Sequence, residues 1–146
     1  MVSTAIVYAS THHGNTRKLV EAIAEKYPVV LIDALTQSQA DLSPYTWIGF
    51  ASGIDFGKFY APVEQFLEQN LPQNKQVFFL YTCARVSPRF TRSIREKATQ
   101  KYALCMGEYG CRGFNTYGPW KLMGGMNKGH PSEKELAEAL RFYESL

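Results

Sequence analysis

The sequence predicts a doubly wound α/β fold, in which helices cover both faces of a five-stranded parallel sheet with strand order 2-1-3-4-5. Two observations support this prediction. Short, uninterrupted apolar runs, typical of strands covered on both faces, alternate along the chain with helical patterns. This alternation implies parallel strands joined by helices, and 146 residues are enough for one such domain, expected to span residues 1–146.

The first half of the chain begins this alternation. Residues 5–9 (AIVYA) are the first expected strand, and apolar residues then repeat at helical spacing between Leu19 and Tyr27. Residues 28–33 (PVVLID) and 47–51 (WIGFA) are expected to be the second and third strands. The segment between these two strands has room only for a turn or a short helix.

The second half continues in the same way. Pro62 suits the first turn of a helix, where its missing N–H costs no hydrogen bond. Residues 76–82 (QVFFLYT) are the fourth expected strand, a basic helix follows, and residues 103–111 (ALCMGEYGC) form a weaker fifth strand. Ser132 and Glu135 have the spacing of a capping box, which predicts the start of the last helix.

Composition excludes several classes of protein. The 45% hydrophobic and 20% charged residues are ordinary for a soluble globular domain, and no apolar run approaches the roughly 20 residues that span a bilayer. No basic region precedes the first strand, so we expect no signal peptide. Three cysteines without a C-x-x-C pair favour a reducing cytoplasm over a disulfide framework. The net charge of +3 is mild, which makes nucleic acid an unlikely partner.

A polar loop joins the first strand to the first helix. Its residues are Ser10, Thr11, His12, His13, Gly14, Asn15 and Thr16. In a doubly wound sheet this edge carries the ligand site, and the N–H groups at a helix N-terminus favour an anion. Hydroxyl and amide donors suit a phosphate, and Gly14 permits close approach or a positive φ. The simpler alternative is that Asn15 or Thr16 caps the helix. No carboxylate or cysteine has metal-ligand spacing with the two histidines, so no metal site is expected.

Two further loops leave the same edge, after the third and fourth expected strands. They span residues 51–60 and 82–90. The candidate binding residues in them are Ser52, Gly53, Ile54, Asp55, Phe56, Gly57, Thr82, Cys83, Ala84 and Arg85. For Cys83, a packing role at the strand end is the expectation ahead of ligand contact.

The motif STHHGNT resembles the hydroxyl-x-x-Gly-Asn-Thr phosphate signature of flavodoxins and flavodoxin-like proteins. The stretch GFNTYGPWKLMGGMNKGHP, residues 113–131, resembles a tail of flavodoxin-family proteins from anaerobic microbes. The resemblance covers the whole chain and is closest to short-chain members. It implies FMN as cofactor and a peptide flip permitted by Gly53 and Gly57 toward the flavin N5. Phe56, Phe59 or Tyr60 could stack on a face of the ring, and packing under the loop is the alternative for each of them. Asp55 beside the ring would lower the potential of the flavin.

The stretch from Arg85 to Lys101 is strongly basic, with Glu96 as its one acid. The basic residues are Arg85, Arg89, Arg92, Arg95, Lys97 and Lys101. Such a stretch is either a solvated helix face or a docking patch for an acidic partner. Flavodoxins usually carry acids here, so their usual partners are in doubt. A basic surface would instead attract an acidic redox protein such as a ferredoxin, or a phosphorylated nucleotide.

These features predict a cytoplasmic, FMN-binding electron-transfer protein that carries one or two electrons between redox partners. Two alternatives remain open. One is an FMN-dependent oxidoreductase acting on a quinone or a porphyrinogen, and the other is a flavin-free binding module that uses the basic helix. The aromatic residues Phe114, Tyr117 and Trp120 are expected to form a lid or docking edge at the cofactor site, and the alternative is a loop packed onto the sheet edge by these aromatics.

Overall fold

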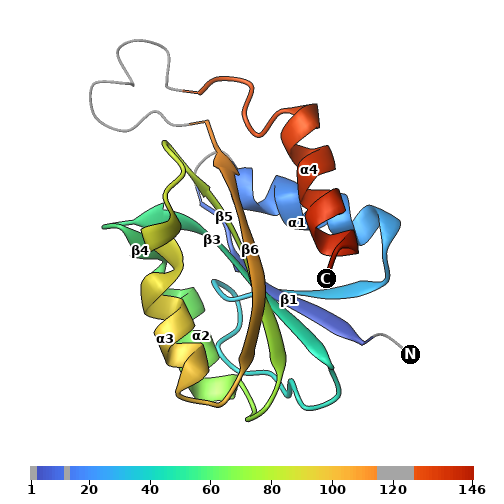
Figure 1. The fold of residues 1–146 in the computed structure, drawn as a ribbon, viewed down its shortest axis with the longest axis vertical. Coiled ribbons are helices and arrows are strands. Elements are labelled where there is room, and N and C mark those ends of the chain that lie inside the picture. Colours follow the sequence, from blue (N-terminus) through green and yellow to red (C-terminus); the bar gives the residue numbers. More distant parts are fainter. Residues whose placement is uncertain (1–2, 12–13, 115–126) are drawn as a thin grey trace.

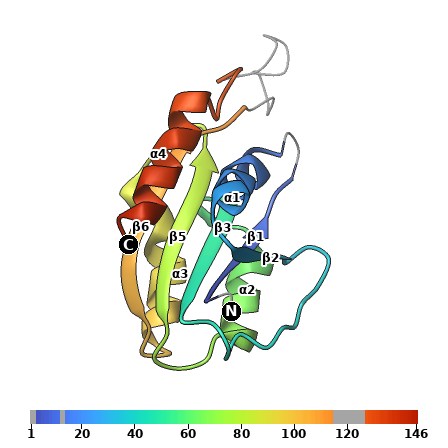
Figure 2. The same ribbon diagram turned by 90° about the vertical axis from the view of Figure 1, so that its right-hand side faces the viewer.

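The computed structural model describes residues 3–11, 14–114 and 127–146 and contains a central sheet with helices on both faces (Figure 1). The parallel strands lie side by side in the order β2-β1-β3-β5-β6 (Figure 2). They are β1 (Thr4–Ala9), β2 (Val29–Asp33), β3 (Trp47–Asp55), β5 (Gln76–Cys83) and β6 (Leu104–Arg112). The short strand β4 (Lys58–Phe59) pairs only with the end of β3, antiparallel. The predicted order 2-1-3-4-5 is therefore confirmed.

Each face of the sheet is covered by two helices. Helices α1 (Asn15–Lys26) and α4 (Glu133–Glu144) pack on one face, where Leu19, Ile23 and Ala139 are fully buried against β1 and β5. Helices α2 (Ala61–Asn70) and α3 (Arg92–Thr99) cover the other face. Within the described parts of the chain, no helix has the length and apolar character needed to cross a membrane.

The helix boundaries follow from local sequence signals. Ser132 Oγ accepts a hydrogen bond from the Glu135 amide, and the Glu135 carboxylate accepts one from the Ser132 amide, so the predicted capping box is present. Pro62 lies in the first turn of α2, as expected. The basic helix differs from the prediction, because it opens with a 3-10 turn, η1 (Pro88–Thr91), before α3 begins. Arg85 precedes both elements.

The expected loop over residues 51–60 is a β-hairpin instead. Strand β3 continues to Asp55, which pairs with Lys58 across a two-residue turn. Phe56 and Gly57 form that turn with φ of 52° and 77°, the left-handed pair that a tight hairpin requires. Glycine suits such a backbone and phenylalanine adopts it at a cost, so the turn was not evident from the sequence.

Candidate functional site

The carboxyl ends of β1, β3 and β5 bring the three predicted loops together at one edge of the sheet. Thr16 Oγ1 and Thr82 Oγ1 lie 3.0 Å apart in a buried position, which joins the first loop to the end of β5. Thr11 Oγ1 donates a hydrogen bond of 3.0 Å to Tyr60 Oη, which joins the first loop to the hairpin. The first loop thus contacts both of the others at the point where the strand order reverses.

The N-terminus of α1 is open to an anion. Its N-cap is Gly14, with φ of 69° and no side-chain cap. Within residues 3–11, 14–114 and 127–146, no acceptor meets the amides of Asn15 and Thr16, whereas the Arg17 amide donates to Ser10 Oγ at 3.2 Å. The alternative that Asn15 or Thr16 caps the helix is therefore wrong, because both side chains are committed to distant partners.

The neighbouring helix α4 also begins at this edge, but its N-terminus is closed. The capping box of Ser132 and Glu135 occupies the N–H groups that an anion would need. A helix N-terminus carries about half a positive charge, and of these two helices α1 is the one whose first amides are available within the described residues. This difference places the candidate anion site at Gly14–Thr16.

Asn15 connects the first loop to the segment that follows β6. Its Nδ2 donates a 2.8 Å hydrogen bond to the carbonyl oxygen of Phe114. Its Oδ1 is buried and has no partner in the described structure, so it can accept a hydrogen bond from a ligand hydroxyl. A Cβ at Gly113 would lie 2.5 Å from Asn15 Nδ2, so only glycine fits there. Sequence reasoning missed this contact, although the glycine after β6 is a signal for it.

The hairpin residues occupy distinct environments. Ser52 Oγ accepts a hydrogen bond of 2.9 Å from the Tyr60 amide and donates one of 2.6 Å to the Gly53 carbonyl. A Cβ at Gly53 would lie 2.3 Å from Tyr60 Oη, so close packing explains this glycine. Ile54 is half-buried and Asp55 is exposed. At the tip of the hairpin, Phe56 is 95% exposed and free to contact a flat ligand.

One of the three aromatic candidates for ring stacking is wrong. Phe59 is fully buried in the core, where its ring packs edge-on against Phe79 at 6.2 Å between centroids. Tyr60 lies at the hairpin base with its hydroxyl bonded to Thr11. The exposed Phe56 and the half-buried Tyr60 remain candidates for the flat surface of the site.

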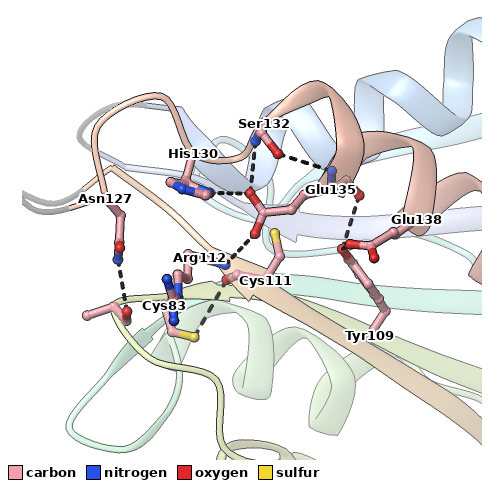
Figure 3. Close-up of polar contacts among 10 residues, drawn as sticks. Cys83, Tyr109, Cys111, Arg112, Asn127, His130, Ser132, Glu135 and Glu138 are labelled. Carbon is pink, nitrogen blue, oxygen red and sulfur yellow. Dashed lines mark hydrogen bonds and ion pairs between the residues drawn. The ribbon is translucent and has the colours of Figure 1, made fainter.

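The third loop begins at Thr82, which is buried, and continues through Cys83, Ala84 and Arg85. Burial raises the pKa of the Cys83 thiol to about 12, and the thiol lies 3.6 Å from the Cys111 carbonyl oxygen (Figure 3). Cys83 is therefore a protonated packing residue rather than a reactive thiolate. The Cys83 carbonyl accepts from the Gly113 amide at 2.9 Å, and the Ala84 carbonyl accepts from Asn127 Nδ2 at 2.8 Å.

Glu135 links the end of β6 to the segment that leads into α4 (Figure 3). Besides the Ser132 amide, its carboxylate accepts the Arg112 amide at 3.2 Å and contacts His130 Nδ1. Burial alone would raise the pKa of Glu135, but the bonds from Ser132, His130 and Arg112 outweigh it and lower the pKa below its ordinary value. Glu135 thus stays ionised and joins the end of β6 to the start of α4.

His12, His13, Tyr117 and Trp120 lie outside the described residues. Among the residues that are described, no group of histidine, cysteine or acidic side chains has the arrangement of a metal site. The donors at this edge are main-chain amides, hydroxyls and an amide side chain. Such a set fits a phosphate ester with hydroxyl groups better than it fits a metal ion.

Comparison with known proteins identifies the family of this chain. A family model for the flavodoxin domain matches residues 5–108. The uncharacterized protein MJ0298 of Methanocaldococcus jannaschii is 35% identical over 143 residues, which cover 97% of this chain and 95% of that relative.

Solved structures show the same fold at low sequence identity. A flavodoxin from the domain Archaea superposes with a TM-score of 0.63 at 20% identity, covering 94% of this chain and 92% of that one. A flavoprotein from Lactobacillus acidophilus NCFM, solved in complex with FMN, superposes with a TM-score of 0.58 at 17% identity, covering 77% of this chain and 93% of that one. With the family match and the relative from M. jannaschii, these results show that the chain belongs to the flavodoxin domain family.

Proposed function

We propose that this chain binds FMN at the carboxyl edge of the sheet and works as an electron-transfer protein. The observation that carries the proposal is the open N-terminus of α1, where the Asn15 and Thr16 amides lack acceptors among the described residues while the neighbouring α4 is capped. The flavoprotein solved with FMN, which shares the fold, supports the choice of cofactor.

Each loop has a part in holding the cofactor. The amides of Asn15 and Thr16, with the hydroxyls of Ser10 and Thr11, would hold the phosphate, and Asn15 Oδ1 would accept from a hydroxyl of the ribityl chain. The main chain of the hairpin and of residues 83–85 would meet the polar edge of the ring, and Phe56 would cover part of a face. His12 and His13 stay candidates for the same loop.

FMN, when bound, supplies the capacity to take up and release one or two electrons. The residues of this chain anchor and tune it. The negative charge of Asp55 disfavours an anionic reduced ring, which lowers its potential. The protonated Cys83 thiol adds no charge beside the ring. The three free cysteines in the described residues support the cytoplasm as the place of action.

The direct test is titration of the purified chain with FMN and with riboflavin, followed by flavin fluorescence. We expect FMN to be quenched and bound at least about a hundredfold more tightly than riboflavin, because only FMN carries the dianion for α1. Equal affinity for the two flavins would contradict the proposed anchor. A reductive titration of the loaded protein then counts the electrons taken up.

The alternative enzyme is tested with the same sample. Turnover of a quinone or a porphyrinogen by the FMN-loaded protein, with no protein partner present, would identify an FMN-dependent oxidoreductase and contradict the function as an electron carrier. Absence of flavin binding would leave only the flavin-free binding module.

A further inference from the structure

A basic groove runs along the outer side of η1 and α3. It has a volume of about 640 Å³ and is lined by these two elements, with Arg89, Arg92 and Arg95 among its residues. On the inner side of the same helix, Ile94 and Ala98 are fully buried in the core. The groove is therefore a surface that the described residues leave open after their own packing is complete.

The charges of this groove are largely uncompensated. Arg95 is paired with Glu108 at 2.6 Å, and Lys97 on the adjoining side of α3 is paired with Glu68 and Glu64 of α2. Arg85, Arg89 and Arg92 are exposed and make no ion pair with any acid in the described residues. Glu96 is the one acid lining the groove. A positive excess therefore faces solvent.

Apolar side chains lie in and around the first turn that lines the groove, of which Pro88 is a lining residue. Val86 is 47% exposed, Pro88 is exposed, and Phe90 is half-buried with its ring packed edge-on against Tyr81 at 6.0 Å. Arginines beside exposed apolar residues are typical of protein–protein interfaces. The exposed Val86 and Pro88 favour a protein surface over a small phosphorylated ligand, which would need charge and hydrogen bonds alone.

The groove also adjoins the candidate cofactor site. The loop from Cys83 to Ser87 leads directly from β5 into η1, so the proposed ring-binding residues 83–85 come shortly before Pro88, where the groove begins. A protein docked over Val86 and Arg89 would therefore contact the segment that directly follows the proposed flavin-binding residues.

We propose that this groove docks a small acidic redox protein, its carboxylates against Arg85, Arg89 and Arg92 and an apolar contact on Val86 and Pro88. The proposal rests on the proposed function, since the partner exchanges electrons with the flavin. In each exchange the partner loses one electron and is oxidised, the flavin held by this chain gains it, and no covalent bond is made or broken.

The test uses the FMN-loaded protein and an oxidised acidic [2Fe–2S] ferredoxin as probe, with binding measured by calorimetry and electron transfer from reduced ferredoxin by stopped flow. The variant is Arg89→Glu/Arg92→Glu. The control is Lys26→Glu/Arg141→Glu, which changes the charge equally on exposed positions of α1 and α4, on the other face of the sheet. Thermal unfolding of both variants verifies that they fold.

We expect ferredoxin to bind the wild type, with affinity falling about tenfold as salt rises from about 20 to about 200 mM. The groove variant should lose at least about tenfold in affinity and in the second-order transfer rate, while the control stays within about twofold. An unchanged groove variant, no binding by the wild type, or tighter binding of double-stranded DNA than of ferredoxin at about 150 mM salt would each overturn the proposal.

The same samples separate this proposal from the one it rests on. FMN binding and reduction by dithionite are measured for wild type, variant and control. If FMN binds and is reduced in all three but ferredoxin does not distinguish them, only the docking surface is wrong. If FMN does not bind, the proposed function fails first.

Discussion

Thr16 and Thr82 place their hydroxyl oxygens 3.0 Å apart in the buried region between α1 and the end of β5. Thr16 is 2% exposed and Thr82 is 4% exposed, so neither hydroxyl can find water in place of the other. The pair lies directly beneath the two loops that the proposed function assigns to the phosphate and to the ring. Loss of this hydrogen bond should therefore lower both the free energy of unfolding and the affinity for the cofactor.

Replacing one member of this pair by the isosteric valine leaves the other hydroxyl buried without a partner. We expect Thr16→Val and Thr82→Val each to lower the free energy of unfolding by about 1–3 kcal/mol. The double variant should be no less stable than either single variant, because no orphaned hydroxyl remains. Urea unfolding at neutral pH measures the free energy of unfolding of the wild type, of both single variants and of the double variant. Thr99→Val, which removes an exposed hydroxyl bonded within its own helix, serves as the control. Strictly additive losses in the double variant would argue against coupling.

Gly14 has a left-handed backbone at the start of α1, and among the described residues no atom beyond its chain neighbours and its own helix backbone lies within 4 Å of the position of an added Cβ. The cost of Gly14→Ala is therefore conformational and should be about 1–2 kcal/mol of the free energy of unfolding. Gly14→Asn should cost less, since asparagine visits this region more readily. Chemical denaturation compares the two. Equal stability of wild type and alanine variant would show that the loop adopts another backbone.

The three thiols should differ in reactivity. Burial raises the pKa of Cys83 to about 12 and raises the pKa of Cys111 as well, so neither forms thiolate near neutral pH. Cys105 is exposed, although partial burial of its sulfur raises its pKa too. Iodoacetamide at pH 8 should label Cys105 slowly and leave the other two intact in the native protein. Peptide mass spectrometry reads the sites, and complete labelling in urea is the control. Early modification of Cys83 would contradict its assigned packing role.

Glu135 should make stability depend on pH. Its pKa is lowered in the folded state, so its contribution is complete above the unfolded value near 4.5 and is lost as pH falls through the folded pKa. We expect Glu135→Gln to be less stable than wild type by about 1 kcal/mol at pH 7. This difference should shrink as pH is lowered below about 4.5. Glu133→Gln, an exposed acid in the same helical turn, is the matched control. A difference in the free energy of unfolding that persists at pH 3 would show that the effect comes from the packing or hydrogen-bond geometry of the side chain and not from its charge.

The fold was predictable because its signals are local. Apolar runs mark β1 and β5, and the spacing of Ser132 and Glu135 marks the start of α4, whatever the rest of the chain does. The hairpin at Phe56 and Gly57 was not predicted, because it lacks such a local signal. Its sequence lacks the Asn-Gly or Asp-Gly pair that announces a two-residue turn, and only the pairing of Asp55 with Lys58 reveals it.

The candidate site was predictable in its loops but not in its contacts. The capping rule considers only the next few residues, whereas Asn15 bonds to Phe114, 99 positions away, and Thr16 faces Thr82. The triple role of Glu135, with Arg112 and His130 as further partners, also depends on tertiary structure. Periodicity determines which residues reach the edge, but it carries no information about which of them meet there.

The contrast between the capped α4 and the open α1 bears on how long the protein survives in a cell. The first amides of α4 are bonded by its own capping box. On the proposed function, the first amides of α1 are instead bonded by FMN, which is derived from riboflavin. A ligand that binds only the native state lowers the unfolded fraction that quality-control proteases degrade. The amount of this protein in the cell would then rise and fall with the supply of riboflavin, without any change in transcription.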